Sequence, residues 1–294
     1  MKPEITDMKS PGEFLKFDVF GSSGALRPDP VFIIGMHRSG TSALGGALEA
    51  LGLTVGKAAM PPDAEGGNPK GFYENLALMQ FHDRFLKFIH SEWQHPEPVG
   101  RKRFRGFKAC LFRRELLKML KDEFGQDRPL IKDPRMCRLM PLWIPLIRKH
   151  FPRASFILPV RHPVEVASSL RKRDGFTLDH GLKLWVVHVL ESERTTRGLS
   201  RQFTTYNQLM RSPIETVRQL ANNLGLPTDA IAAAVARQID TKLRHHSELP
   251  WPAGQPHEEL TLSIHQTLAS GAAPNQEMLD RLRQEYYSRM GWDC

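Results

Sequence analysis

One short segment, Gly35-Met36-His37-Arg38-Ser39-Gly40-Thr41-Ser42, holds the residues whose types and spacing best suit anion binding. Gly35 and Gly40 have the spacing of a phosphate-binding loop, G-x-x-x-x-G. In such a loop, backbone N–H groups and the positive end of the following helix point to one place, where an anion is stabilised. Thr41 replaces the lysine that nucleotide hydrolases carry there, and a cation, Arg38, lies inside the loop. The segment therefore predicts an anion site that lacks the usual ATP-binding lysine.

The elements around this loop predict an α/β fold. Val31–Ile34 is a continuous apolar run, as expected of a strand buried on both faces, and a helix over Ala43–Leu51 follows the loop. Further strands are expected over Pro129–Lys132, Ser155–Val160 and Gln202–Tyr206. Strands that alternate with helices indicate a three-layer sandwich, in which a central parallel β-sheet has helices on both faces, as in P-loop nucleoside triphosphate hydrolases.

Helical spacing and end signals place several helices between these strands. They are expected over Asn75–Ile89, over Leu139–Lys149 with interruption by proline, over Val164–Leu170 after Pro163, over Leu178–Leu199 and over the amphipathic stretch Gln276–Arg289. Ser212-Pro213-Ile214-Glu215 has the pattern of a capping box and predicts a helix start. Since no linker is evident, residues 1–294 are expected to form a single domain, with residues 1–30 as an irregular extension.

Composition narrows the class of protein. The 294 residues are 40% apolar and 25% charged, which excludes a wholly disordered chain and a fibre. The formal net charge of +9 suits an anionic partner: nucleic acid, an acidic membrane, or a phosphorylated or sulfated small molecule. Cys110 and Cys137 are expected to be core thiols and Cys294 a terminal one, without a disulfide. With no apolar run long enough for a signal or a membrane span, a soluble protein of the reducing cytoplasm is expected.

The anion loop resembles the 5′-phosphosulfate loop of the sulfotransferase family, x-x-x-[KR]-S-G-T-[ST]. A second family signature, an arginine at the end of a later strand with a serine eight residues on, is matched by Arg161 and Ser169. Lys132-Asp133-Pro134-Arg135 is similar to the Lys-Asp-Pro of the tyrosylprotein branch, and Tyr206-Asn207-Gln208-Leu209 to a stretch near the adenine. The resemblance covers roughly residues 31–225 in consistent order.

The resemblance implies that the co-substrate is 3′-phosphoadenosine 5′-phosphosulfate (PAPS), with no metal. It implies these contacts to PAPS: His37, Arg38, Ser39, Gly40, Thr41, Ser42, Arg161, Ser169, Arg173 and Tyr206. The C-terminal Arg-Lys-Gly segment and the catalytic histidine of the cytosolic branch have no counterpart here. The chain is therefore more similar to bacterial carbohydrate-type and tyrosylprotein sulfotransferases, whose base is a glutamate.

Sulfuryl transfer by in-line displacement builds negative charge on the leaving oxygen, and Arg38 and Lys132 would meet that charge. The acceptor hydroxyl must lose a proton, and Glu74, a carboxylate among aromatic residues, is the candidate general base. A helix N-terminal acid that complements the helix dipole explains Glu74 equally well. His37 and Asp133 are reserve candidates for the base.

Two other functions stay open. A small-molecule kinase with a degenerate phosphate loop would require Mg²⁺-ATP and use the arginines of segment 161–173. A polyanion-binding protein would use the basic run Arg101–Lys108, which a solvated surface also explains. The histidines have no metal-ligand spacing, so no metal is expected. The acceptor is expected to be a hydroxyl of a carbohydrate or glycoconjugate, and no nucleic acid partner is expected.

Overall fold

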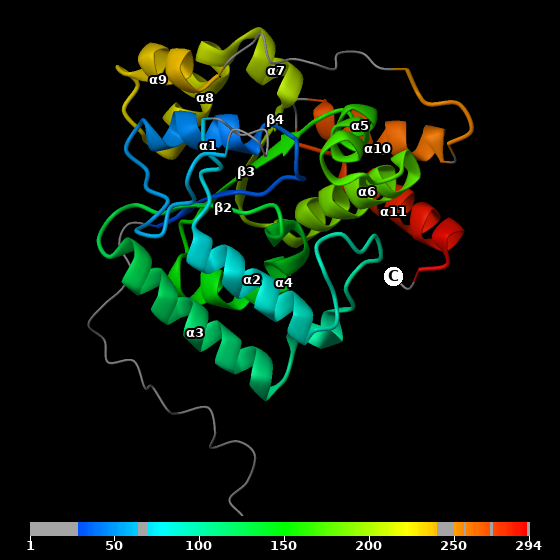
Figure 1. Cartoon of the computed structure of the whole chain (residues 1–294), viewed down its shortest axis with the longest axis horizontal. Coiled ribbons are helices and arrows are strands. Elements are labelled where there is room, and N and C mark those ends of the chain that lie inside the picture. The colour runs from blue at the N-terminus through cyan, green and yellow to red at the C-terminus, as the bar shows by residue number, and fades with distance from the viewer. Residues whose placement is uncertain (1–28, 64–69, 240–249, 256, 271–272, 293–294) are drawn as a thin grey trace, which may run out of the picture.

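The computed structural model describes residues 29–63, 70–239, 250–255, 257–270 and 273–292 (Figure 1). The predicted N-terminal extension therefore lies almost wholly outside the described residues. The strands are β1 (Val31–Ile33), β2 (Leu130–Lys132), β3 (Ser155–Val160) and β4 (Ser200–Thr205). The α-helices are α1 (Thr41–Glu49), α2 (Leu76–Phe88), α3 (Phe107–Phe124), α4 (Met136–His150), α5 (Pro163–Asp174), α6 (Leu178–Thr195), α7 (Tyr206–Arg211), α8 (Pro213–Leu224), α9 (Ile231–Gln238), α10 (Glu258–Ala269) and α11 (Gln276–Met290), and a 3₁₀ turn, η2, spans Arg101–Phe104.

The strands form one parallel sheet in the order β2-β1-β3-β4. Val31 of β1 lies opposite Leu130 of β2 on one side and opposite Ser155 of β3 on the other. β1 is therefore an interior strand, and its uninterrupted apolar sequence follows from the helices that cover both faces of the sheet. Because the strands are parallel, their carboxyl ends meet at one edge of the sheet. The predicted anion loop, Lys132 and Arg161 all follow strands at this edge.

Successive side chains of β1 point to opposite faces of the sheet, and each face has its own apolar cluster. Phe32 packs with residues of α2, α3 and α4 in one cluster. Val31 and Ile33 pack with residues of α1, α8 and α9 in another. Figure 1 shows these two helix groups on opposite sides of the sheet, with α5, α6, α10 and α11 gathered around a third cluster. The predicted three-layer α/β architecture is confirmed.

The predicted interruption of the 139–149 helix is wrong, because α4 continues through Pro141 and Pro145. Each proline removes an intrahelical hydrogen bond, which alone would disfavour the helix. Leu139 and Trp143 are 0% exposed, and α4 is packed against the sheet along much of its length. Tertiary packing therefore holds a helix that its local sequence opposes.

The start of α8 is predicted correctly, but its capping box is not. Pro213 is in the first turn, yet the side chain of Ser212 makes no capping hydrogen bond. The box forms one element earlier, where Thr205 and Gln208 cap α7 reciprocally. Tyr206 consequently begins a helix rather than ending a strand.

The expectation of two core thiols holds for Cys137, which is buried, and is wrong for Cys110, which is exposed. Both are free cysteines. Cys110 lies on the first turns of α3, a helix that was not predicted, where Ala109 is the one buried residue between positions 105 and 115. Cys294 lies outside the described residues.

Candidate functional site

The loop between β1 and α1 is shaped by close approaches that exclude side chains. A Cβ on Gly35 would lie 2.7 Å from the Pro159 side chain of β3. Gly40 has a φ of 82°, and a Cβ there would lie 2.8 Å from the ring of Tyr206. Arg38 also has a left-handed backbone, with a φ of 66°, which turns the chain into α1. The glycine spacing noted in the sequence therefore reflects packing of the loop against β3 and α7.

The loop has the features of an anion cradle. The side chain of Ser39 is buried, and its Oγ has no hydrogen-bond partner among the residues that the structure describes. Within the same described ranges, no side chain caps the N-terminus of α1 at Gly40. The first-turn N–H groups of a helix have no intrahelical acceptors, so they attract an anion. The unpartnered hydroxyl of Ser39 thus lies next to the uncapped N-terminus of α1, and both can donate hydrogen bonds to one anion.

The two sequence signatures meet in space. The Nε–H of Arg38 donates a hydrogen bond to the Oγ of Ser169 on α5, at 2.8 Å. The guanidinium of Arg161 donates to the backbone oxygen of Arg38, also at 2.8 Å, and to the carboxylate of Glu165. Its central carbon lies 4.0 Å from the centroid of the Tyr206 ring. Residues from the loop, β3, α5 and α7 therefore form one contiguous cluster.

Positive charge is crowded in this cluster. The pKa of Arg38 is lowered, first by burial and then by the charges of Arg173 and Arg161. Arg173 itself pairs with Asp174 and makes no hydrogen bond that joins it to Arg161 or Ser169 among the contacts found. Its guanidinium lies 5.8 Å from the centre of the Trp93 ring. Mutual repulsion of arginines is relieved by an anion placed between them, so the cluster favours a phosphate or sulfate group.

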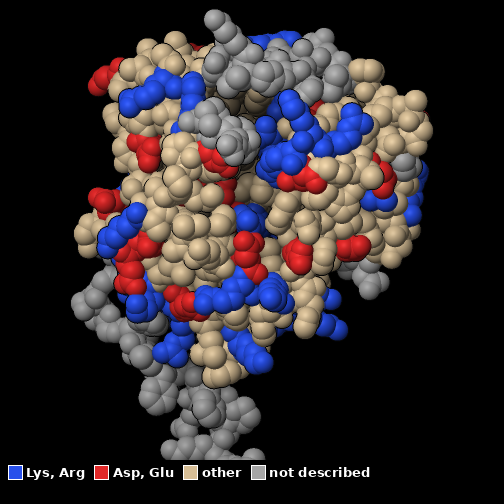
Figure 2. Space-filling model, viewed as in Figure 1, with Lys and Arg blue, Asp and Glu red and all other residues tan. Residues whose placement is uncertain are grey.

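The predicted catalytic residues Lys132 and Glu74 form a buried pair. The Nζ of Lys132 lies 2.5 Å from Oε1 of Glu74, 2.9 Å from the Phe72 carbonyl and 3.2 Å from Oγ of Ser42. Lys132 therefore connects the carboxylate to the first turn of α1. Burial raises the pKa of Glu74, and Asp133 raises it further, while Lys132 and Arg135 oppose that change. Figure 2 shows acidic and basic side chains meeting in a hollow at the centre of this face.

Asp133 is held in a network that Arg135 links to this pair, since Arg135 lies 3.1 Å from Asp133 and 4.0 Å from Glu74. The Asp133 carboxylate lies 2.7 Å from Nδ1 of His82 and accepts hydrogen bonds from Arg135. Trp143 donates its indole N–H to Nε2 of His82, so Nδ1 of His82 carries the proton that is shared with Asp133. Burial works to raise the pKa of Asp133, but Arg135 and His82 lower it overall. An ionised, fully engaged carboxylate is a poor general base, so Asp133 is disfavoured in that role.

His37 is held against the aromatic ring of Trp93, with 4.3 Å between the ring centroids. Burial, followed by the charge of Arg173, lowers its pKa well below the usual value. Its Nε2 is buried without a hydrogen-bond partner among the described residues. His37 is therefore a neutral group beside Trp93 and near the charge of Arg173.

Some residues of the site gave no signal in the sequence. His82 and Trp143 lie on helices α2 and α4, and nothing in their spacing indicates that they clamp Asp133. Tyr73, with a φ of 55°, packs against Gly45 and Gly46 of α1 and donates to Gln238. Only the two adjacent glycines in a helix hinted at such a close contact.

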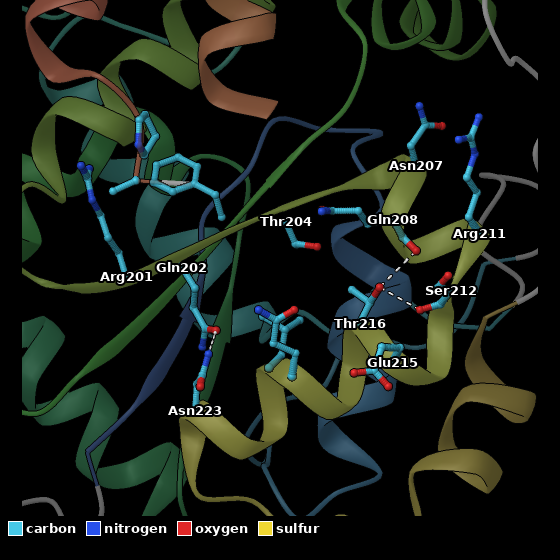
Figure 3. Close-up of a pocket in the computed structure, with 15 residues that line it drawn as sticks. Arg201, Gln202, Thr204, Asn207, Gln208, Arg211, Ser212, Glu215, Thr216 and Asn223 are labelled. Atoms are coloured by element: carbon cyan, nitrogen blue, oxygen red, sulfur yellow. Dashed lines mark hydrogen bonds between the residues drawn. The ribbon is translucent and has the colours of Figure 1, made fainter. Parts of the chain in front are cut away.

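A cavity of about 550 Å³ lies along the outer edge of β4 (Figure 3). It is lined by residues of β4, α7 and α8 together with Ala273 and Pro274, and by none of the predicted site residues. Several lining groups already have partners: Thr216 donates to backbone oxygens of Gln208 and Ser212, and Asn223 donates to Gln202. The cavity is thus distinct from the anion cluster.

Comparisons with known proteins agree with one family. A family model described as "Sulfotransferase family" matches residues 30–230. Among solved structures, the sulfotransferase domain of the Synechococcus olefin synthase is 15% identical, with 92% of this chain and 98% of that chain covered and a TM-score of 0.46. Mouse sulfotransferase SULT7A1 complexed with PAP is 16% identical, with 93% and 91% covered and a TM-score of 0.41.

Sulfotransferase STF1 from Mycobacterium tuberculosis is also 16% identical, with 71% of this chain and 70% of that chain covered and a TM-score of 0.42. No curated protein matches the chain. Within the described residues, none of the helices is long and apolar enough to cross a membrane.

Proposed function

The chain belongs to the sulfotransferase family, and we propose that it transfers a sulfuryl group from PAPS to a hydroxyl acceptor by in-line displacement. The observation that carries the proposal is the contact between Arg38 and Ser169, at 2.8 Å. This contact joins the phosphate loop to the arginine–serine signature, so a ligand with phosphate groups at both ends of one ribose can reach both. Family membership also favours sulfuryl transfer over the kinase alternative.

Binding of the donor is assigned to two groups of residues. The loop N–H groups, the Ser39 hydroxyl and the first turn of α1, with Thr41 and Ser42, would hold the 5′ end. This assignment is supported by the unpartnered Ser39 Oγ. Arg161 and Ser169 would hold the 3′-phosphate, with Arg173 at the rim, and the Tyr206 ring would border the adenine. When bound, PAPS supplies a sulfuryl group on a good leaving group, so the transfer itself requires no metal.

Catalysis is assigned to Arg38, Lys132 and Glu74. Arg38 and Lys132 bring fixed positive charge to the place where negative charge develops as the sulfur–oxygen bond breaks. Glu74 would accept the proton of the acceptor hydroxyl, and its raised pKa suits a base that works near neutral pH. The 2.5 Å contact with Lys132 works against that rise in pKa and positions the carboxylate. His37 contributes a neutral wall rather than a base, because its lowered pKa makes it a weak proton acceptor.

A carbohydrate or glycoconjugate is proposed as the acceptor. Trp93, which is only partly buried, presents an amphipathic ring next to His37 and Arg173. An aromatic ring beside the anion cluster suits the apolar face of a sugar. Two free cysteines, Cys110 and Cys137, support a reducing compartment, and we assign the protein to the cytoplasm.

The direct test is a turnover assay with PAPS and a panel of mono- and oligosaccharides, glycolipids, phenols and a tyrosine peptide, with release of 3′-phosphoadenosine 5′-phosphate (PAP) as the readout. We expect acceptor-dependent PAP release that persists in excess EDTA and is fastest with a sugar hydroxyl. Turnover of Mg²⁺-ATP with no PAP release would overturn the donor assignment. Release with the phenols alone would overturn the carbohydrate assignment and leave the donor intact.

A further inference from the structure

The 3₁₀ turn η2 and the first turns of α3 expose a dense group of cations. The group consists of Arg101, Lys102, Arg103, Arg105, Lys108 and Arg114, all of which are exposed, and it is named here the basic tip. Residues 98–114 contain no aspartate or glutamate. Glu115, which follows directly, pairs with Arg84. The basic tip therefore has a local positive charge that its own segment does not neutralise.

Two large apolar side chains are exposed within the basic tip. Phe107, the first residue of α3, is 78% exposed, and Leu111, one turn later on the same helix face, is 43% exposed. Exposed single apolar residues are common, but an aromatic residue exposed to this extent beside a second apolar residue is not. The free thiol of Cys110 lies between them in sequence and is exposed as well.

The segment is held firmly from below. Phe104 is 2% exposed, and its ring centroid lies 5.8 Å from that of Phe85 on α2. Arg103 donates a hydrogen bond to the backbone oxygen of Ile89, and Arg113 donates to the backbone oxygen of Phe104. These contacts fix the backbone on both sides of Phe107, so its side chain is held in an exposed position. Figure 1 shows the first turn of α3 at the lower end of the described ribbon, and Figure 2 shows lysine and arginine side chains along this lower edge.

We propose that the basic tip docks the protein on the surface of an anionic phospholipid bilayer. Lys and Arg side chains near an acidic membrane are attracted to its headgroups, and an aromatic side chain between them enters the boundary of the acyl chains. A nucleic acid or a sulfated glycan would satisfy the same charges, and a base or a sugar face can stack on Phe107, but neither offers an apolar medium that takes up Phe107 and Leu111 together. The apolar pair therefore favours the bilayer. This inference does not depend on the proposed function.

The experiment measures co-sedimentation of the full chain with vesicles of phosphatidylcholine alone or mixed in equal parts with phosphatidylglycerol. We expect binding to the mixed vesicles only, and weaker binding at high salt. Lys102→Glu with Arg105→Glu is expected to reduce the affinity by roughly twentyfold or more, at about fivefold for each charge removed. Phe107→Ser is expected to reduce it by roughly tenfold. Arg281→Glu, exposed on α11, and Ile214→Ser, exposed on α8, serve as matched controls that should bind as the wild type does.

A fluorescent label on Cys110 reports insertion directly, with Cys294→Ser used to remove the terminal thiol. We expect a blue shift of the label on mixed vesicles and none on heparin or DNA. Three results would overturn the proposal: no binding to mixed vesicles, binding that is unchanged in Phe107→Ser, or heparin or DNA binding as tight as vesicle binding. Lys102, Arg105, Phe107, Arg281 and Ile214 are all exposed, so unchanged melting temperatures should show that these variants fold.

Discussion

Glu74 has two roles that its position allows, and substitution separates them. A helix N-terminal acid acts through its charge on the dipole, whereas a general base acts only on the reacting proton. Glu74→Gln should lower kcat by roughly 10²- to 10⁴-fold while the dissociation constant for PAP stays nearly unchanged. Steady-state kinetics and calorimetric titration with PAP measure the two quantities. A loss of stability with little loss of kcat would favour the dipole role.

The raised pKa of Glu74 also predicts how kcat changes with pH. Burial raises the pKa of Glu74, so the carboxylate forms at a higher pH than an ordinary glutamate does. A base must be deprotonated, so kcat should rise with pH through this raised pKa, and the rise should vanish in Glu74→Gln.

Arg38 is the cation that the anion loop itself supplies, so its removal tests the assignment to the leaving oxygen. Arg38→Ala should reduce kcat by about 10²- to 10³-fold, the usual effect of losing one preorganised donor at a developing negative charge. The matched control is Arg218→Ala, an exposed arginine on α8 whose nearest acid is 4.0 Å away. If both variants keep wild-type kcat, the assignment of Arg38 to the leaving oxygen is wrong and its contact with Ser169 is structural.

At the scale of elements, the loop after β1 depends on close packing against α7. Gly40→Ala places a Cβ 2.8 Å from the Tyr206 ring in a left-handed backbone. Gly52→Ala has the same backbone problem, with a φ of 102°, but nothing within 4 Å. Both should lose about 1–2 kcal/mol of stability from the backbone, and Gly40→Ala about 1–3 kcal/mol more from overpacking. Urea unfolding measures this difference, and PAP affinity should fall only in Gly40→Ala. Equal losses of stability in the two variants would show that the Tyr206 ring moves aside without cost.

The carboxyl end of β2 is fixed between α2 and α4 through Asp133. Asp133→Asn removes the charge of a buried carboxylate that pairs with Arg135 and accepts a hydrogen bond from His82, so it should cost about 3 kcal/mol or more at neutral pH. The folded-state pKa of Asp133 is lowered, so its contribution is full above the unfolded pKa of about 3.9 and is lost as the pH falls below it. The stability gap between wild type and variant should therefore narrow in acid. A gap that is constant from neutral pH to acid would contradict this account.

Local sequence predicted those elements whose signals agree with their packing. The strand at 31–34 and the helix at 75–89 were predicted to within two residues, since a buried parallel strand and an amphipathic helix have distinctive spacing. α4 shows the opposite case, in which burial overrides two prolines. The long helix α3 was missed because a cationic run precedes it and its first turns expose Phe107, so that most of its buried apolar residues lie in its second half.

The candidate site was predicted where a motif carries the chemistry, and missed where distant residues support it. Arg38 and Ser169 are 131 positions apart, and only a family signature could suggest their contact. The clamp on Asp133 comes from two helices whose residues show no shared pattern. Positions that hold a functional residue from behind are set by tertiary packing, which spacing along one chain does not encode.

For the molecule as a whole, binding of PAP should increase the free energy of unfolding. PAP at 100 times its dissociation constant should add about 2.7 kcal/mol. For a chain of this size, that should raise the melting temperature by roughly 5–10 °C. Adenosine 5′-monophosphate lacks the 3′-phosphate, so it should raise the melting temperature much less at equal concentration.

Arg161→Gln should reduce the shift with PAP toward that with the monophosphate, because Arg161 is assigned to the 3′ end. Scanning calorimetry with both nucleotides and both proteins completes the comparison. Equal shifts from the two nucleotides in the wild type would discredit the assignment of Arg161 and Ser169, since the extra phosphate would then have no partner.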